Sequence, residues 1–339
     1  MNRRQFLGVS GRLGLGLLAL PLMGCGGVKG PVSTVPDDTL AVAVSVLQPN
    51  LDPHDWTTAV GPRTLAPLFD ALTFVQNDGQ LRPALAVGWT RVNPTTWQFR
   101  LRVDDAKFHN GETFSPDSVQ VTFDRLMQPA SSLGVGRVLA TVDKLDIVNP
   151  WTINIATKQP DDALPRRLSL VYMLPPQYFG RVGIDAFLQQ PIGTGFWMFD
   201  AFEAGRSLSV TLFRDTWRAA RGDDPPPMKN LRLQVMPNAA DRVAGLKALQ
   251  LDVATQIDDA VAADLQAAGF KVQHEDLGRG NALDAGWQTA ALGTPLTSGT
   301  DVLATAADVQ GVATEPSGAW WFDRATKTEL QRIAVMGGA

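Results

Sequence analysis

Apolar positions follow two patterns in the N-terminal half of the chain, and each predicts a strand of a different kind. Thr39–Leu47 is a nearly continuous run of apolar residues, which is typical of a strand buried on both faces. Thr96–Val103 instead alternates polar and apolar residues, the period of a strand. Asn110-Gly111 follows it, and this pair is a strong signal for a hairpin turn.

A helical period begins after Ser115. Ser115 is a favourable N-cap residue, and Pro116 is favourable at the first helical position. Apolar residues then recur at helical spacing, at Val119, Phe123 and Leu126. Pro129 ends the pattern, so we expect a helix whose apolar stripe faces the core.

Two further hairpins are indicated farther along the chain. Each consists of two apolar-rich runs around a short turn, namely Val142–Val148 with Trp151–Thr157, and Phe196–Phe202 with Ser207–Phe213.

Strands then alternate with helices. We expect strands at Leu231–Met236, Leu251–Ala254 and Phe270–Gln273, and helices from Asn238 through Leu249 and over Asp258–Ala268. Asn238 is a suitable N-cap, and Gly269 ends the second helix. The fold class is therefore mixed α/β, with antiparallel hairpins inserted and a right-handed crossover in the strand–helix–strand unit.

The first residues have the pattern of an export signal. Arg3, Arg4 and Arg12 form a basic region, and the apolar run Leu13–Met23 follows. This run is too short to span a bilayer, which needs roughly 20 apolar residues. Asn2–Leu7 resembles a twin-arginine export signal, and an ordinary secretory signal is the alternative. We therefore expect residues 1–24 to be a signal peptide.

The single cysteine lies directly after this signal. Leu22-Met23-Gly24-Cys25 resembles a lipobox, in which a bacterial prolipoprotein is cut before the cysteine and the thiol is lipidated. Cys25 is thus expected to anchor the chain to a bacterial membrane, in the periplasm or at the cell surface. Residues 25–38 contain many Gly, Pro and small polar residues, which predicts a flexible lipidated tether.

Composition excludes several functions. One cysteine in 339 residues allows no intramolecular disulfide and offers no cysteine-rich zinc site. The net charge is −4, and the three arginines before Cys25 contribute +3, so the rest of the chain carries −7. Such an acidic chain lacks the electrostatic footprint for nucleic acid. His54, His109 and His274 share no metal-ligand spacing, and no GxSxG or HExxH motif supports a hydrolase. We expect no metal, no cofactor and no enzyme activity.

A series of short strings gives the chain a family resemblance. In chain order they are Leu51–His54, Leu68–Leu72, Leu81–Ala86, Trp97–Arg102, Phe108–Gly111, Phe114–Val119, Pro191–Phe196 and Phe213–Trp217. Their order resembles the extracytoplasmic solute-binding proteins of ABC importers, in the large family that takes peptides and nickel (family 5). The resemblance implies a type II periplasmic-binding-protein-like lobe over residues 39–284, with an inserted hairpin-rich subdomain at approximately 72–190.

The chain departs from this family after Asp284. Family members are substantially longer, and their second lobe closes over the ligand, whereas only 55 residues, 285–339, follow here. Val309–Ala313 and Trp320–Asp323 resemble the family's C-terminal end, which returns to the first lobe. We therefore expect a shortened linker and return segment over 285–339, with the second lobe largely absent.

Two segments are candidate ligand-binding sites. In peptide-binding relatives the loop after the first strand contacts the ligand; here it contains Asp55, Trp56, Thr57, Thr58 and Ala59. Phe196 and Trp197 form a second candidate wall. Ligand pockets combine apolar walls with a few placed polar groups, which these segments supply. Packing of Trp56, Phe196 and Trp197 in the core is the alternative for each aromatic residue.

The resemblance implies a membrane-anchored solute-binding lipoprotein of an ABC transport system, for peptides or a similar small solute. Its partners would be the ligand and the transporter permease subunits. A degenerate one-lobed member that binds another protein is the alternative, and a hydrolase is a remote one. An exposed face of the first lobe would then be partly apolar.

Overall fold

The computed structural model describes most of the chain after its N-terminal segment. All of the residues that the structure describes belong to the unit formed by residues 33–339. The described residues are 33–56, 60–76, 79–128, 133–220, 225–226, 228–276, 300–306, 312–314, 320–322 and 333–337. The predicted signal peptide and the predicted lipidation site at Cys25 lie outside them.

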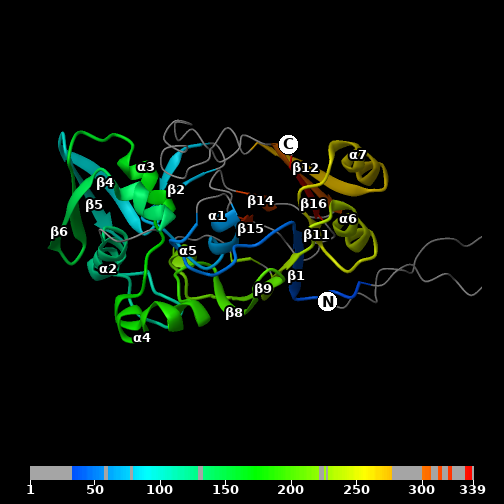
Figure 1. Cartoon of the computed structure of the whole chain (residues 1–339), viewed down its shortest axis with the longest axis horizontal. Helices are drawn as coiled ribbons and strands as arrows, with labels where there is room; N and C mark the ends of the chain where they lie inside the picture. The colour runs from blue at the N-terminus through cyan, green and yellow to red at the C-terminus, as the bar shows by residue number, and fades with distance from the viewer. Residues whose placement is uncertain are drawn as a thin grey trace, which may run out of the picture. The chain divides into compact units, whose positions relative to one another are not determined.

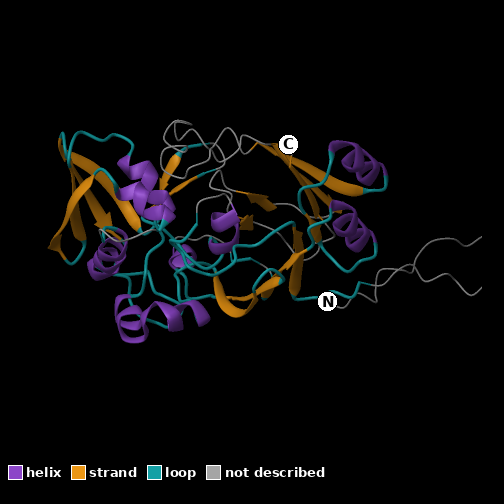
Figure 2. Cartoon of the chain, in the orientation of Figure 1, coloured by secondary structure: helices purple, strands orange, loops and turns teal. Residues whose placement is uncertain are grey.

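Among the described residues, the largest sheet has eight strands in the order β12-β13-β16-β11-β1-β10-β9-β8. Figure 1 labels several of these strands, and Figure 2 draws strands in orange. Its strands are β1 (Thr39–Val44), β8 (Trp197–Glu203), β9 (Ser207–Leu212), β10 (Asn230–Val235), β11 (Val253–Ala254), β12 (Phe270–Asp276), β13 (Thr300–Ala306) and β16 (Ile333–Gly337). β8 and β9 form the predicted hairpin, and β9 is antiparallel to β10.

The strand β1 lies between two parallel neighbours. Val42 is opposite Leu233 of β10 on one side and Val253 of β11 on the other. Ala41, Val42 and Ala43 are completely buried, which explains why the apolar run at this strand is continuous rather than alternating.

Helices α6 (Ala239–Lys247) and α7 (Asp259–Ala267) follow β10 and β11. Asn238 caps α6 as predicted, because its side chain accepts a hydrogen bond of 2.9 Å from the backbone N–H of Ala240. Helix α6 connects β10 to β11, and β1 lies between these two strands. The predicted strand–helix–strand unit is therefore present. Gly269, at φ 87°, ends α7 as predicted.

A second, antiparallel sheet has the order β4-β5-β7-β6. Its strands are β4 (Ala86–Asn93), β5 (Thr96–Leu101), β6 (Val142–Asn149) and β7 (Thr152–Thr157). Helix α2 (Pro116–Leu126) begins where Ser115 and Pro116 predict, and it contacts β6. Phe99, Phe123 and Ile153 are at most 1% exposed, so the predicted helical stripe is part of the core.

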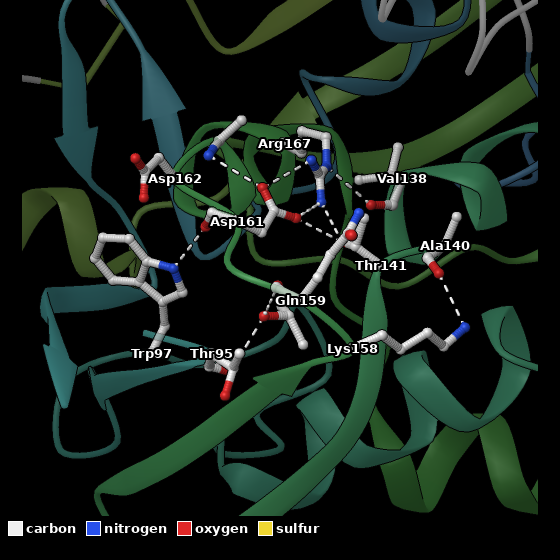
Figure 3. A network of polar contacts seen from close by, with 12 residues as sticks. Thr95, Trp97, Val138, Ala140, Thr141, Lys158, Gln159, Asp161, Asp162 and Arg167 are labelled. Carbon is white, nitrogen blue, oxygen red and sulfur yellow. Dashed lines mark hydrogen bonds and ion pairs between the residues drawn. The ribbon is translucent and has the colours of Figure 1, made fainter. Parts of the chain in front are cut away.

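A buried ion pair joins this sheet to the helices beside it (Figure 3). Arg167 donates to both carboxylate oxygens of Asp161, and its Nε donates to the carbonyl of Val138 at 3.1 Å. Thr141 Oγ1 donates to Asp161 at 2.5 Å. The Trp97 indole N–H reaches the Asp161 carbonyl at 2.8 Å, so strand β5 is tied to the same cluster.

Apart from the 14-residue helix α4, the remaining elements are at most six residues long. They are α1 (Val60–Leu65), α3 (Leu164–Arg167), α4 (Pro176–Gln189), α5 (Trp217–Ala220), β2 (Thr73–Val75), β3 (Leu81–Pro83), β14 (Val312–Thr314) and β15 (Trp320–Phe322), with 3-10 turns at Gly134–Leu139 and Leu168–Leu170.

Two local predictions need correction. Asn110-Gly111 does form a turn, with Gly111 at φ 85°, but it is closed by a single bridge between Lys107 and Thr113 rather than by a hairpin extending β5. The prediction of a flexible tether over residues 25–38 does not hold for Thr34 and Val35, which are attached to the fold. Val35 is 7% exposed and packs beside Leu251, and Thr34 N–H donates to the Leu249 carbonyl at 3.1 Å. The buried side chain of Val35 and the backbone hydrogen bond of Thr34 therefore attach these two residues to the rest of the fold.

Candidate functional site

Three loops leave the same edge of the main sheet. Because β1 is paired in parallel with β10 and β11, the carboxyl ends of all three strands lie side by side. The loops that follow them are residues 45–56, 236–238 and 255–258, which we call the carboxyl edge. Ligands of open α/β sheets bind outside the carboxyl ends of such strands, so this edge is the candidate site.

The loop after β1 is held by a buried ion pair. Arg125 of α2 donates from Nη1 to Asp52 Oδ1 at 2.8 Å and from Nη2 to Asp52 Oδ2 at 2.5 Å. The side chains are 13% and 7% exposed, and such bidentate pairs fix geometry as well as charge. Asp52 in turn accepts from the backbone N–H of His54 at 2.9 Å.

The imidazole of His54 completes this cluster. Its Nε2–H donates to the Tyr172 carbonyl at 2.8 Å, so Nδ1 is the acceptor facing Arg125 at 2.7 Å. Burial lowers the pKa of His54 from 6.5 to about 4, and the positive charge of Arg125 acts in the same direction. Burial raises the pKa of Asp52, but the hydrogen bonds and charge of Arg125 outweigh it, and the net shift is downward. The pair is therefore ionised and the imidazole neutral at neutral pH.

Trp56 is buried in this loop. It is 2% exposed, and its indole N–H donates to the Pro53 carbonyl at 2.9 Å. A Cβ atom on Gly61 would lie 2.4 Å from Trp56 Cβ, so the indole packs where helix α1 has no side chain. The structure therefore favours the core alternative for Trp56, and the expectation of an exposed aromatic wall is wrong at this position.

Asp55 is the exposed polar residue of the same loop. Its carbonyl accepts from Gln48 Nε2, and its carboxylate lies 3.5 Å from Asn50 Nδ2. Val46, which is 50% exposed, supplies an apolar side chain on this loop. Thr57, Thr58 and Ala59 lie outside the described residues, so their predicted role is neither supported nor contradicted.

Phe196 and Trp197 do not join this edge. Trp197 begins β8 and pairs with Leu212, at the end of β9. Through β9 and β10, the register places the start of β8 level with Thr39, the first residue of β1. The candidate wall therefore lies at the amino end of β1, opposite the loop that follows it. Trp197 is 2% exposed and Phe196 packs against the core, which favours the core alternative for both.

Arg242 was not among the candidates, yet it links two of the three loops. Lying on α6 and 3% exposed, it donates to four backbone carbonyls at 2.6–2.8 Å. These belong to Met236 and Pro237 after β10, and to Thr255 and Gln256 after β11. Burial lowers the pKa of Arg242, and the charge of Asp258 opposes this shift. Its position in the sequence, on a helix between two strands, gave no signal for this role.

A separate hollow of about 490 Å³ lies away from the carboxyl edge. It is lined by Phe74, Gln76, Arg82, Pro83, Val87 and Arg102. Both of its guanidinium groups are already bonded to protein, Arg82 to Gln76 at 2.8 Å and Arg102 to Asp105 at 3.0 Å. The carboxyl edge is therefore the stronger candidate.

No group of three His, Cys, Asp or Glu side chains in the described part of the chain is arranged to hold a metal ion. None of the described helices combines the length and apolar character needed to cross a membrane.

The sequence of the central region decides the family. The family described as "Bacterial extracellular solute-binding proteins, family 5 Middle" matches residues 80–290, more than half of the 339 residues. The chain belongs to this family. Proteins of family 5 bind small ligands outside the cytoplasm and deliver them to ABC permeases.

Curated relatives match part of the chain. The glutathione-binding protein GsiB of Salmonella typhi is 26% identical over 182 residues, which cover 53% of this chain and 35% of the relative. GsiB of Pectobacterium atrosepticum is 26% identical over 195 residues, which cover 57% of this chain and 37% of the relative. This family 5 chain thus spans about a third of the length of the curated relatives it matches.

Solved structures confirm the fold. NikZ from Campylobacter jejuni in complex with Ni(L-His) has a TM-score of 0.64 at 23% identity, covering 71% of this chain and 48% of NikZ. DppA from Helicobacter pylori in complex with the peptide STSA has a TM-score of 0.63 at 18% identity, covering 70% of this chain and 50% of DppA. The family 5 chain has the mixed α/β fold of a type II periplasmic-binding-protein-like lobe, as predicted.

Proposed function

We propose that this chain is the solute-binding component of an ABC importer and that it takes a peptide or a similar small solute at the carboxyl edge. The observation that carries the proposal is the parallel trio β10-β1-β11, whose carboxyl ends bring three loops together in a family 5 fold. The loops supply exposed Asp55 and Val46, a polar and an apolar contact. The proposal includes no catalytic step.

The relatives suggest the ligand class to test. GsiB is named a glutathione-binding protein, and DppA is solved with a peptide. Both ligands have a peptide backbone, which offers hydrogen-bond donors and acceptors that the carboxyl edge can meet. Glutathione and tetrapeptides are therefore the first probes.

Binding is tested by calorimetry on the purified folded chain. We expect heat with glutathione or a tetrapeptide, and at least about tenfold weaker binding for Asp55→Ala, since losing a hydrogen bond from a carboxylate costs about 1.5–3 kcal/mol. The control is Asp215→Ala, an exposed carboxylate paired with Lys107 elsewhere in the fold. Equal affinity of the two variants would remove Asp55 from the site.

The second candidate is a protein-interaction module. It is favoured by the 50% exposure of the apolar side chain of Val46 at the carboxyl edge. Absence of heat with every solute, together with a permease-free protein complex from membranes, would favour this candidate over transport.

We also propose that Cys25 anchors the chain in the membrane after export. The support is the lipobox-like string before it and the absence of any other cysteine. Mass spectrometry of the membrane fraction should find a diacylglyceryl-modified N-terminus at Cys25, because two acyl chains hold a protein firmly to a bilayer. Cys25→Ser should carry no diacylglyceryl group, because it lacks the thiol. A wild-type membrane fraction in which the chain has an unmodified N-terminus would contradict the anchor.

A further inference from the structure

The bonds of Arg242 are unusual because all four go to backbone carbonyls. Nη1 donates to Met236 at 2.6 Å and to Pro237 at 2.8 Å. On the other loop, Nε donates to Thr255 and Nη2 to Gln256, both at 2.6 Å. A guanidinium presents donors in a rigid planar fork, so bonds to two loops fix the loops relative to each other.

One of these loops contains a strained residue. Gln256 has φ 55°, in the left-handed region that residues with a side chain rarely adopt. Its own carbonyl is the acceptor of Arg242 Nη2, so the bond acts on the strained peptide directly. Strain of this kind persists only where surrounding contacts determine the conformation.

We infer that Arg242 is a positioning residue for solute recognition: it holds the loops after β10 and β11 at the carboxyl edge and keeps Gln256 left-handed. The solute-binding part of this inference rests on the proposed function. Arg242 itself is 3% exposed, so it acts through the loop backbone rather than by touching the solute.

Amide hydrogen exchange on the full chain tests the positioning role without a ligand. Arg242→Lys keeps the charge but cannot reach four carbonyls, so exchange in residues 255–258 should be at least tenfold faster than in wild type. The matched control is Arg167→Lys, because Arg167 is 4% exposed and belongs to the Asp161 cluster of the antiparallel sheet. Equal exchange in 255–258 for both variants would overturn the inference.

A second pair of variants tests the strain. Glycine adopts positive φ without steric cost, so Arg242→Lys should lower the Tm less in a Gln256→Gly background than in wild type. An identical Tm loss in the two backgrounds would show that Arg242 does not maintain this conformation.

Calorimetry with glutathione and a tetrapeptide separates this inference from the proposed function. Where wild type binds a probe, Arg242→Lys should weaken binding at least tenfold and Arg167→Lys less than twofold. Unchanged affinity in Arg242→Lys would overturn the recognition role. If wild type binds neither probe, the proposed ligand class fails, while the exchange measurement still decides whether Arg242 holds the loops.

Discussion

Trp56→Ala should lower the free energy of unfolding by about 3–5 kcal/mol, the usual cost of truncating a buried Trp to Ala. The indole is 2% exposed, its N–H bonds to the Pro53 carbonyl, and it fills the space beside Gly61. Removing the indole leaves a cavity, whereas protein interiors are normally close-packed. Denaturant unfolding followed by circular dichroism measures the loss.

Trp151→Ala is the matched control for this prediction. Trp151 is 46% exposed at the turn between β6 and β7, and its indole N–H makes a long contact of 3.3 Å to Asp104. Its truncation should cost less than about 1 kcal/mol, as for most surface positions. A Trp56→Ala variant as stable as Trp151→Ala would place the indole at the surface and restore it as a candidate ligand contact.

The sequence predicted the elements whose cause is local. The continuous apolar run identified β1 as a strand with two buried faces, and Ser115-Pro116 located the start of α2. The N-cap at Asn238 and the stop at Gly269 were equally readable, because capping depends on residues a few positions apart.

The candidate site was less predictable, because its geometry depends on register and packing. The sequence around Trp56 does not show whether its side chain contacts a ligand or packs in the core. The packing partner is Gly61, whose missing side chain leaves room for the indole. Phe196 and Trp197 lie at the end of the sheet opposite the loop after β1. This position follows from the strand pairing β1-β10-β9-β8, which the sequence does not specify. Arg242 bonds to carbonyls, which every residue has, so no sequence pattern marks its partners.

The buried carboxylate of Asp70 gives the second large prediction. Asp70 Oδ1 accepts from Arg218 Nη2 at 2.7 Å, and Oδ2 accepts from the Trp217 indole N–H at 2.8 Å. Thr194 Oγ1 donates to the same Oδ2 at 3.1 Å. The four residues are at most 7% exposed and come from three separate parts of the chain, so this one carboxylate holds three segments together.

Asp70→Ala should lower the free energy of unfolding by about 3–5 kcal/mol, because removing one partner leaves the charge of Arg218 buried without its carboxylate. Asp70→Asn keeps the size and one acceptor but loses the charge, so its loss should be smaller. The matched control is Asp215→Ala: Asp215 pairs with Lys107 at 2.8 Å, but the side chains are 71% and 44% exposed, and such pairs contribute at most about 1 kcal/mol. Urea unfolding of the three variants separates the two environments. Equal losses for Asp70→Ala and Asp215→Ala would mean that water, rather than the Asp70 carboxylate, compensates Arg218 in the folded chain.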